Sequence, residues 1–408
     1  MLGISKNHRY LLKDGIFFPY LADTAWTIFQ RLTRDEIIFY LDKREAQGFH
    51  AIQACVLSEL DGIFTPSVDG LLPFCGGDVT RVNDSFFEKV RFFVDECEKR
   101  NMVAVLLPTW GDKFNKKWGI GPEIFNESNA RFYGRFLAQL IGSRENVIFM
   151  LGGDRPIETK EQRRIIDEMA AGIKEGEKTP HLITYHPCGE ASSADYFADC
   201  DYIDFHSLQS GHSFGGFKSE RMIAEVLKKE EKPCLDAESF YEDFPIDFDV
   251  GWCYRLNSID ISRGIYRNLM AGSLGTVYGH QSVWCFRCTV DEEYSYTWEE
   301  ALDRPAAWKM ANMNRLLSLV DITKSHSCSH CINGLARESD SYLMLYAKKQ
   351  TPCFFRADEK IRWKNQGLWF DILSGEIKDC EAAWGQKISA CSPFENDGIL
   401  ILYKEEYE

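Results

Sequence analysis

Eight short apolar segments alternate with helical segments along most of this chain, and this alternation constrains the fold more than any other feature. The strand-like segments lie at residues 17–22, 51–57, 102–108, 147–151, 182–185, 202–209, 234–237 and 275–277. Helices are expected at residues 33–47, 85–100, 129–141, 159–175, 219–229 and 258–271, with capping boxes at Thr33, Ser85 and Thr159. Eight such units predict a (β/α)8 TIM barrel. An open doubly wound sheet is less favoured, because no glycine-rich phosphate-binding turn follows the first strand.

The pattern changes after about residue 320, where short, partly alternating segments separated by turn residues replace the β/α units. These segments lie at residues 341–347, 351–355, 367–371, 376–377 and 398–403. They predict a small antiparallel β-sandwich, so we expect a barrel over residues 1–319 and a C-terminal sandwich over residues 320–408. A last helix over residues 298–319, kinked at Pro305, is expected to pack between the two parts.

Composition excludes several classes of function. The 408 residues carry a net charge of -15, which argues against nucleic acid and anionic membranes as partners. No apolar run is long enough to span a membrane, and no phosphate-binding loop or G-x-S-x-G elbow is present. Fourteen cysteines behind an N-terminus without an apolar leader predict reduced thiols and a cytoplasmic protein.

Two carboxylates each close a strand-like segment. Asp154 follows residues 147–151 and a Gly-Gly pair, and Glu238 follows residues 234–237. In a TIM barrel the chemistry lies at the C-terminal ends of the strands, and a glycosidase needs two acids there. One acid protonates the leaving oxygen, and the other attacks or activates water. Structural alternatives are an N-cap role for Asp154 and a solvated acidic loop around Glu238.

All eight strand-like segments end in polar or aromatic residues, which packing alone explains poorly. Aromatic faces can cover the apolar faces of a sugar ring, and planar polar groups can bond its hydroxyls. The expected substrate-binding residues are Asp23, Trp26, Glu59, Trp110, Asp112, Lys113, His186, Gln209, His212, Asp236, Tyr241, Tyr278, His280, Gln281 and Trp284. The expected partner is therefore an oligosaccharide, with no cofactor.

A metal site is the less favoured interpretation of several residues. Two Cys-x-x-Cys pairs, at residues 285–288 and 328–331, have the spacing of zinc ligands, with His326 and His330 nearby. The gap between the pairs is longer than in a zinc ribbon, so no metal is expected. A metal-dependent hydrolase is a further alternative, because histidines lie near strand ends at positions 186, 206, 212 and 280.

The same strand ends resemble those of the apiosidase-like glycoside hydrolases over roughly residues 8–320. The matching segments are Leu21-Ala22-Asp23-Thr24-Ala25-Trp26, Leu107-Pro108-Thr109-Trp110-Gly111-Asp112-Lys113, Leu151-Gly152-Gly153-Asp154-Arg155-Pro156, Thr184-Tyr185-His186-Pro187, Leu235-Asp236-Ala237-Glu238 and Tyr278-Gly279-His280-Gln281-Ser282-Val283-Trp284. The resemblance implies a retaining mechanism, with Asp154 as acid/base and Glu238 as nucleophile. It also implies removal of a terminal sugar such as apiose from a plant-type oligosaccharide.

We expect a closed pocket and exo action. Trp26, Trp110, Tyr241, Tyr278 and Trp284 should surround one cavity with the two acids, and the loops at residues 60–83 and 111–128 should wall it. The alternatives are a non-catalytic carbohydrate-binding barrel and an endo-glycanase of cellulase-like type with an open groove.

Overall fold

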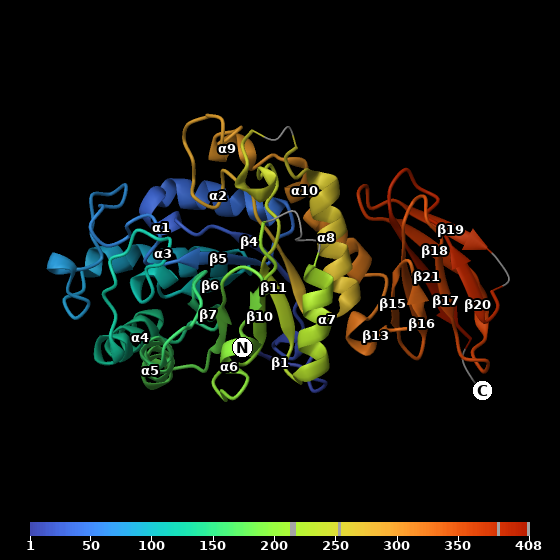
Figure 1. Ribbon diagram of the computed structural model, residues 1–408, viewed down its shortest axis with the longest axis horizontal. Helices are drawn as coiled ribbons and strands as arrows, with labels where there is room; N and C mark the ends of the chain where they lie inside the picture. Colours follow the sequence, from blue (N-terminus) through green and yellow to red (C-terminus); the bar gives the residue numbers. More distant parts are fainter. Residues whose placement is uncertain (213–217, 252–253, 382–383, 406–408) are drawn as a thin grey trace.

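The computed structural model describes residues 1–212, 218–251, 254–381 and 384–405, and its first part is a parallel β/α barrel (Figure 1). The barrel strands are β4 (Tyr20–Thr24), β5 (Ala51–Cys55), β6 (Val103–Leu107), β7 (Val147–Gly152), β8 (Leu182–His186), β10 (His206–Gln209), β11 (Cys234–Glu238) and β12 (Gly275–Tyr278). Six of them pair in the order β12-β4-β5-β6-β7-β8, and β10 pairs with β11. The TIM-barrel prediction is confirmed.

Hydrogen bonds outside the regular ladders connect the two groups of strands. The Thr184 hydroxyl of β8 donates to the carbonyl of Phe205, just before β10, at 2.7 Å. The amide of Leu274, just before β12, donates to the carbonyl of Cys234 in β11 at 2.9 Å. These bonds bring all eight strands into one ring, so their C-terminal ends meet at one mouth.

Helices cover the outside of the barrel at the expected places. They are α2 (Arg34–Ala46), α3 (Asp84–Lys99), α4 (Glu127–Ile141), α5 (Lys160–Gly176), α7 (Ser219–Lys229) and α8 (Ser258–Ala271). Capping boxes at Thr33 and Thr159 are confirmed. The box expected at Ser85 is wrong: α3 begins at Asp84, and Asn83 is its N-cap. The helix expected over residues 298–319 is broken in two, α9 (Trp298–Ala301) and α10 (Pro305–Leu317), because Pro305 starts a new helix at its N1 position.

Short elements complete the barrel part. They are β1 (Leu2–Ile4), β2 (Leu11–Lys13), β3 (Ile16–Phe17), α1 (Ile28–Arg31), β9 (Ala191–Ser192), α6 (Ala194–Phe197) and the 3-10 turns Cys75–Gly77, Gly111–Lys113, Ile246–Phe248 and Ile322–Lys324. The β1–β3 sheet was not predicted. Its Leu2 and Leu11 join the interior residues of the barrel, such as Val103 of β6. None of the described helices is long and apolar enough to cross a membrane.

Side chains along the barrel strands point alternately into the barrel interior and toward the outer helices. Odd-numbered positions of β6, such as Val103 and Val105, belong to the barrel interior, whereas Ala104 and Leu106 pack against the outer helices. Polar residues fill part of the interior: Gln53 accepts from the Tyr20 hydroxyl at 3.0 Å and donates to the carbonyl of Ala237 at 2.9 Å. This alternation fixes which strand-end side chains face the mouth.

The C-terminal part is antiparallel, as predicted. One sheet has the order β13 (His326–Cys328), β15 (Leu335–Glu338), β16 (Tyr342–Ala347), β21 (Gly398–Lys404), β18 (Trp363–Asp371) and β19 (Ile377–Glu381). The second contains β14 (Cys331–Ile332), β17 (Cys353–Arg356) and β20 (Lys387–Ala390). Strands β13, β14, β15 and β20 were not predicted; each is only two to four residues long, too short for a clear pattern.

The larger C-terminal sheet is buried on both faces. In β16, Leu343 and Leu345 pack inside the sandwich, whereas Met344 and Tyr346 pack toward the barrel. The sheet lies beside α8 and α10 (Figure 1). The fully buried Arg337 joins the two parts: its guanidinium donates to the Leu269 carbonyl at the end of α8 at 3.1 Å and also to the Tyr10 hydroxyl.

Candidate active site

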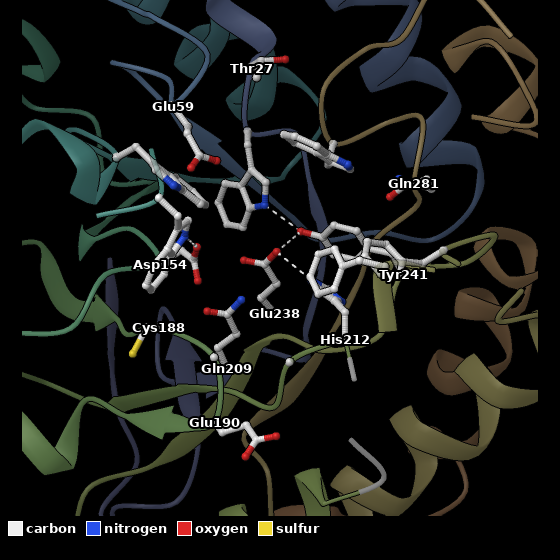
Figure 2. Close-up of a pocket in the computed structure, with 18 of the residues that line it drawn as sticks. Thr27, Glu59, Asp154, Cys188, Glu190, Gln209, His212, Glu238, Tyr241 and Gln281 are labelled. Atoms are coloured by element: carbon white, nitrogen blue, oxygen red, sulfur yellow. Dashed lines mark hydrogen bonds and ion pairs between the residues drawn. The ribbon is translucent and has the colours of Figure 1, made fainter. Parts of the chain in front are cut away.

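A cavity of about 530 Å³ opens at the C-terminal ends of the barrel strands (Figure 2). It is lined by Trp26, Thr27, Glu59, Trp110, Trp118, Asp154, Cys188, Gly189, Glu190, Gln209, Gly211, His212, Glu238, Tyr241, Phe244, Phe248, Gln281, Trp284 and Glu293. Both strand-end acids of the prediction, Asp154 and Glu238, face it.

The backbone at the end of β7 turns through three consecutive residues with positive φ to present Asp154. The φ angles are 89° at Gly152, 119° at Gly153 and 53° at Asp154. A Cβ atom at Gly153 would lie 2.8 Å from the amide nitrogen of Gly111, so only glycine fits. Asp154 is not the N-cap of α5, a position that Thr159 occupies. The strained turn therefore serves to aim Asp154 into the cavity.

The Asp154 carboxyl is held in a state that favours a bound proton. Burial and the negative charge of Glu238 raise its pKa to about 6. Two donors hold Oδ2: Nη1 of Arg155 at 2.8 Å and Nε1 of Trp118 at 3.2 Å. These groups, together with His186, keep the pKa from rising further.

The Glu238 carboxylate is held in the opposite state. Burial alone would raise its pKa, but His186 and His212 outweigh burial and lower it well below its usual range. Nε2 of His186 lies 3.0 Å from Oε2, and Nε2 of His212 lies 3.3 Å from Oε1. The Tyr241 hydroxyl donates to Oε1 at 2.6 Å. Glu238 is thus ionised and fixed in orientation.

Aromatic side chains support these groups from behind. Nε1 of Trp26 donates to the Tyr241 hydroxyl at 2.7 Å, which turns the hydroxyl proton toward Glu238. The rings of Trp26, Trp110 and His186 form a cluster with centroid separations of 5.3–5.7 Å. This packing supports the Glu238 carboxylate from behind and limits its rotation.

Eight of the fifteen expected substrate-binding residues line the cavity. They are Trp26, Glu59, Trp110, Gln209, His212, Tyr241, Gln281 and Trp284. Figure 2 shows Glu59 on the side of Asp154 and Tyr241 and His212 together on the other side of Glu238. The cavity is therefore assembled mainly from side chains that close the strands.

Three charged residues expected at the cavity are instead engaged in buried ion pairs. Asp23 accepts from Nε of Arg44 at 2.6 Å and from the Tyr40 hydroxyl, and its side chain is fully buried. Asp112 and Lys113 pair with each other at 2.8 Å, also fully buried. The expectation that these residues touch the sugar is corrected: a buried charge needs a partner, and each has found one in the protein.

Four more expected residues lie behind the cavity wall. Asp236 accepts from the Ser219 hydroxyl, and Tyr278 donates to Glu242 at 2.8 Å. His280 accepts from a backbone amide and contacts a loop carboxylate at 2.9 Å. His186 touches Glu238 rather than the open space. Their expected contact with substrate is likewise corrected, because strand alternation and loop packing turn them inward.

Several lining residues were missed because they come from loops. Trp118, Phe244, Phe248 and Glu293 belong to the segments after β6, β11 and β12. The loop at residues 111–128 walls the cavity as expected, through Trp118. The loop at residues 60–83 does not: it folds back on the barrel, where its Val68 amide donates to the Gln30 carbonyl at 2.8 Å.

Carboxyl groups dominate the charge of the cavity wall. Five line it: Glu59, Asp154, Glu190, Glu238 and Glu293. Arg155 pairs with Glu59 at 2.6 Å and Lys218 with Glu190 at 2.9 Å. Among the lining residues that the structure describes there is no lysine or arginine. An anionic sugar would meet like charges here, whereas a neutral one would not.

The cysteine pairs do not come together as a four-ligand zinc site. Cys285 lies in the barrel part and its thiol is buried, whereas Cys328 lies in β13 of the C-terminal sheet. Within the described residues, the group with ligand atoms within 4.8 Å of one another is His326, Cys328 and Glu338, on the β13–β15 ladder and away from the cavity.

A model of the apiosidase-like catalytic domain matches residues 5–324. The chain belongs to the apiosidase-like family. It is thus a glycoside hydrolase, and the resemblance seen in the strand ends is confirmed. The matched segment ends in the 3-10 turn that follows α10. A comparison with curated proteins gives no match for this chain.

Solved structures agree with this fold. A family 5 glycoside hydrolase from Bacteroides vulgatus is 24% identical, with a TM-score of 0.87 over 98% of this chain and 93% of that one. Another glycoside hydrolase is 23% identical, with a TM-score of 0.86 over 100% and 97%. A family 5, subfamily 18 enzyme from Streptomyces cattleya, solved with Manβ1-4GlcNAc, is 13% identical, with a TM-score of 0.50 over 74% and 82%.

Proposed function

We propose that this apiosidase-like hydrolase is a retaining, exo-acting enzyme that removes one neutral terminal sugar from an oligosaccharide. Asp154 is the general acid/base and Glu238 the nucleophile. One observation carries the assignment: two carboxyls face the same cavity with opposite pKa shifts, Asp154 raised to about 6 and Glu238 lowered. Divergent pKa values of this kind separate an acid from a nucleophile.

Hydrolysis then proceeds in two steps. Glu238 attacks the anomeric carbon while Asp154 gives its proton to the leaving oxygen, and a glycosyl ester forms at Glu238. Asp154, now ionised, takes a proton from water, which attacks the anomeric carbon and releases the sugar and Glu238. The hydrogen bond from Tyr241 orients Glu238 for its attack in the first step.

The shape and charge of the cavity support exo action on a neutral sugar. Aromatic side chains stand on several sides of the two acids: Trp26, Trp110, Tyr241 and Trp284. Such enclosure suits a terminal ring better than the middle of a polymer. The acidic wall disfavours uronic acids. Apiofuranose is the first glycone to test, because the family is named for it.

The cellular site of the reaction is part of the proposal. We place it in the cytoplasm, acting on imported oligosaccharides. Thirteen described cysteines are free, which fits a reducing compartment. Loss of activity in an oxidising buffer, with recovery on adding a thiol, is the expected result. Activity that is indifferent to oxidation would remove this support.

A panel of aryl glycosides, including the β-apiofuranoside and arabinofuranosides, tests the assignment. For the best substrate, proton NMR of the first-formed product should show retained anomeric configuration. Glu238→Gln should abolish turnover, and Asp154→Asn should cost about 10²–10⁴-fold for poor leaving groups, the usual value of a general acid. Glu190→Gln, a change in another carboxyl of the wall, is the control.

The remaining alternatives predict other results. A carbohydrate-binding barrel would bind sugars and turn over none of the panel. An endo-glycanase would shorten a polysaccharide from within and leave aryl monosaccharides intact. An inverted product would assign Glu238 as the base that activates water instead of the nucleophile.

A further inference from the structure

Trp118 is unusually exposed for an indole in a firmly anchored loop. Its exposed fraction is 62%. The loop around it is fixed from inside: Nζ of Lys113 bonds Asp112 at 2.8 Å and the Gly121 carbonyl at 2.9 Å, and the Gly121 amide donates to Asp112 at 2.8 Å. A buried ion pair therefore fixes a loop whose tip displays an apolar ring to solvent, which folding alone does not require.

The indole rests on a rigid base. The guanidinium carbon of Arg155 lies 4.5 Å from the ring centroid of Trp118, and Arg155 itself is fully buried. A Cβ at Gly119 would lie 2.5 Å from Nη2 of Arg155, so this loop approaches Arg155 as closely as a glycine allows. One face of the ring is thus supported by a cation, while the side chain remains open to the cavity.

Trp118 and Arg155 together determine which oxygen of Asp154 can act as the acid. Both Trp118 and Arg155 donate to Oδ2, which must accept. The proton of the neutral carboxyl then resides on Oδ1. A leaving oxygen has to approach Oδ1, and the group attached to that oxygen has to lie on the Asp154 side of the cavity, next to Trp118.

We propose that Trp118 is the platform of a leaving-group subsite, where the C–H face of a second, uncharged sugar ring stacks on the indole. This rests on the proposed function, since it takes Asp154 as the acid. The glycone lies on the other side, among Tyr241, His212 and Trp284. Trp118 thereby selects substrates whose leaving group is itself a sugar, and its N–H orients the acid.

Two substrates that share the best glycone separate this role from general structural effects. One is a disaccharide with a neutral sugar as leaving group, and the other is the glycosyl fluoride, which has no ring to stack. Trp118→Ala should lower kcat/KM for the disaccharide by about 10- to 100-fold, from lost apolar contact and lost orientation of the acid. For the fluoride the loss should stay within about 3-fold, because fluoride needs little acid catalysis.

Trp118→Phe keeps a ring and removes the N–H. The KM for the disaccharide should stay close to the wild-type value. The high-pH limb of the pH profile should move to higher pH, because the variant lacks the hydrogen bond by which Trp118 lowers the pKa of Asp154. Trp308 is a matched control: it is 43% exposed, donates to Asp303 at 3.2 Å and lies 5.5 Å from Nζ of Lys43, away from the cavity. Trp308→Ala and Trp308→Phe should leave kcat/KM unchanged for both substrates.

A binding measurement separates failure of this inference from failure of the proposed function. In Glu238→Gln, titration calorimetry should give tighter binding of the disaccharide than of the monosaccharide, and adding Trp118→Ala should remove the difference. Equal losses on both substrates, or a second ring that adds no affinity, would overturn the subsite while leaving the acid and nucleophile assigned. Full activity of Glu238→Gln would instead overturn the proposed function.

Discussion

Nε2 of His186 and Oε2 of Glu238 lie 3.0 Å apart, at the C-terminal ends of β8 and β11. Each changes the protonation of the other. Burial lowers the pKa of His186, but Glu238 more than compensates and the net pKa is raised. His186 lowers the pKa of Glu238 in return. The Glu238 carboxylate is therefore kept ionised by a residue that does not itself line the cavity.

Replacing His186 by Gln should reduce activity mainly at low pH. Without His186 the pKa of Glu238 rises, so the limb of kcat/KM at low pH should move to higher pH. The limb at high pH should move to higher pH as well, because His186 also lowers the pKa of Asp154. His206→Gln, a buried histidine of β10 that bonds Ser193 at 2.9 Å, is the control. A limb at low pH that does not move would show that His186 does not tune the nucleophile.

Activity of the wild-type enzyme should decline above about pH 6. Asp154 must be protonated to act as the acid, and its pKa is raised to about 6, so deprotonation above that value removes the acid form. In Glu238→Gln the negative charge that raises this pKa is absent, so the pKa of Asp154 should fall. Carbon-13 NMR titration of the aspartate carboxyls measures the change; an unchanged value would contradict the coupling.

Asp23→Asn should destabilise the barrel strongly without touching the cavity. It leaves the fully buried Arg44 guanidinium without its ion partner, and breaking such a pair costs about 3–5 kcal/mol. Glu127→Gln removes one partner of an exposed pair with Arg164 and should cost little, because solvent screens such a pair. Urea unfolding of both variants checks the contrast. Similar midpoints for the two would contradict it.

Gly153→Ala should impair both folding and catalysis. An added Cβ meets the Gly111 amide at 2.8 Å and requires a left-handed conformation, a strain of about 1–3 kcal/mol before any shift of Asp154. Gly264, in α8, has open space around its Cβ position, so Gly264→Ala should be neutral or stabilise by about 1 kcal/mol. Thermal unfolding and kcat/KM measure both effects. Wild-type activity in Gly153→Ala would show that the turn tolerates a side chain.

Removing residues 319–408 should leave an unstable barrel. The truncation removes Phe370, whose ring lies 6.0 Å from that of Tyr266 in α8, and the Leu373 carbonyl, which accepts from Asn312 of α10 at 2.9 Å. It also removes Arg337 from the Tyr10 and Leu269 contacts. The full chain should unfold in a single transition by calorimetry. Residues 1–318 that are soluble and equally stable would refute the idea that the sandwich clamps the barrel.

The barrel was predictable because each strand and helix carries its own local pattern. Thr33 and Thr159 cap helices with neighbours three residues away, and Val103 to Leu107 is uniformly apolar. The strands at residues 326–338 were not predictable, since His326 and Cys328 are exposed or half-buried and become strands only by pairing with β15. Pairing partners are a tertiary property, which a single segment does not encode.

Both carboxyls could be placed at the cavity because the C-terminal ends of barrel strands meet at one mouth. Their neighbours were harder to assign. Asp23 and Trp26 are three residues apart, yet Asp23 meets Arg44 behind the wall and Trp26 faces the cavity. Asp23 turns away from the cavity because its partner, Arg44, lies behind the wall, and Arg44 is 21 residues further along the chain. Trp118 was missed because it lies in a loop, where no helix or strand periodicity indicates the direction of a side chain.

The two-sided burial of β16 has a consequence for how such proteins change over time. Its side chains pack alternately into the core of the sandwich and into the core shared with the barrel. Gene fusion could therefore not exchange the C-terminal part for another domain without disrupting the shared core. A sandwich borrowed from another enzyme would have to present large side chains where Met344 and Tyr346 now stand. The catalytic half and its companion are therefore expected to be inherited together, and to diverge in step along that shared sheet.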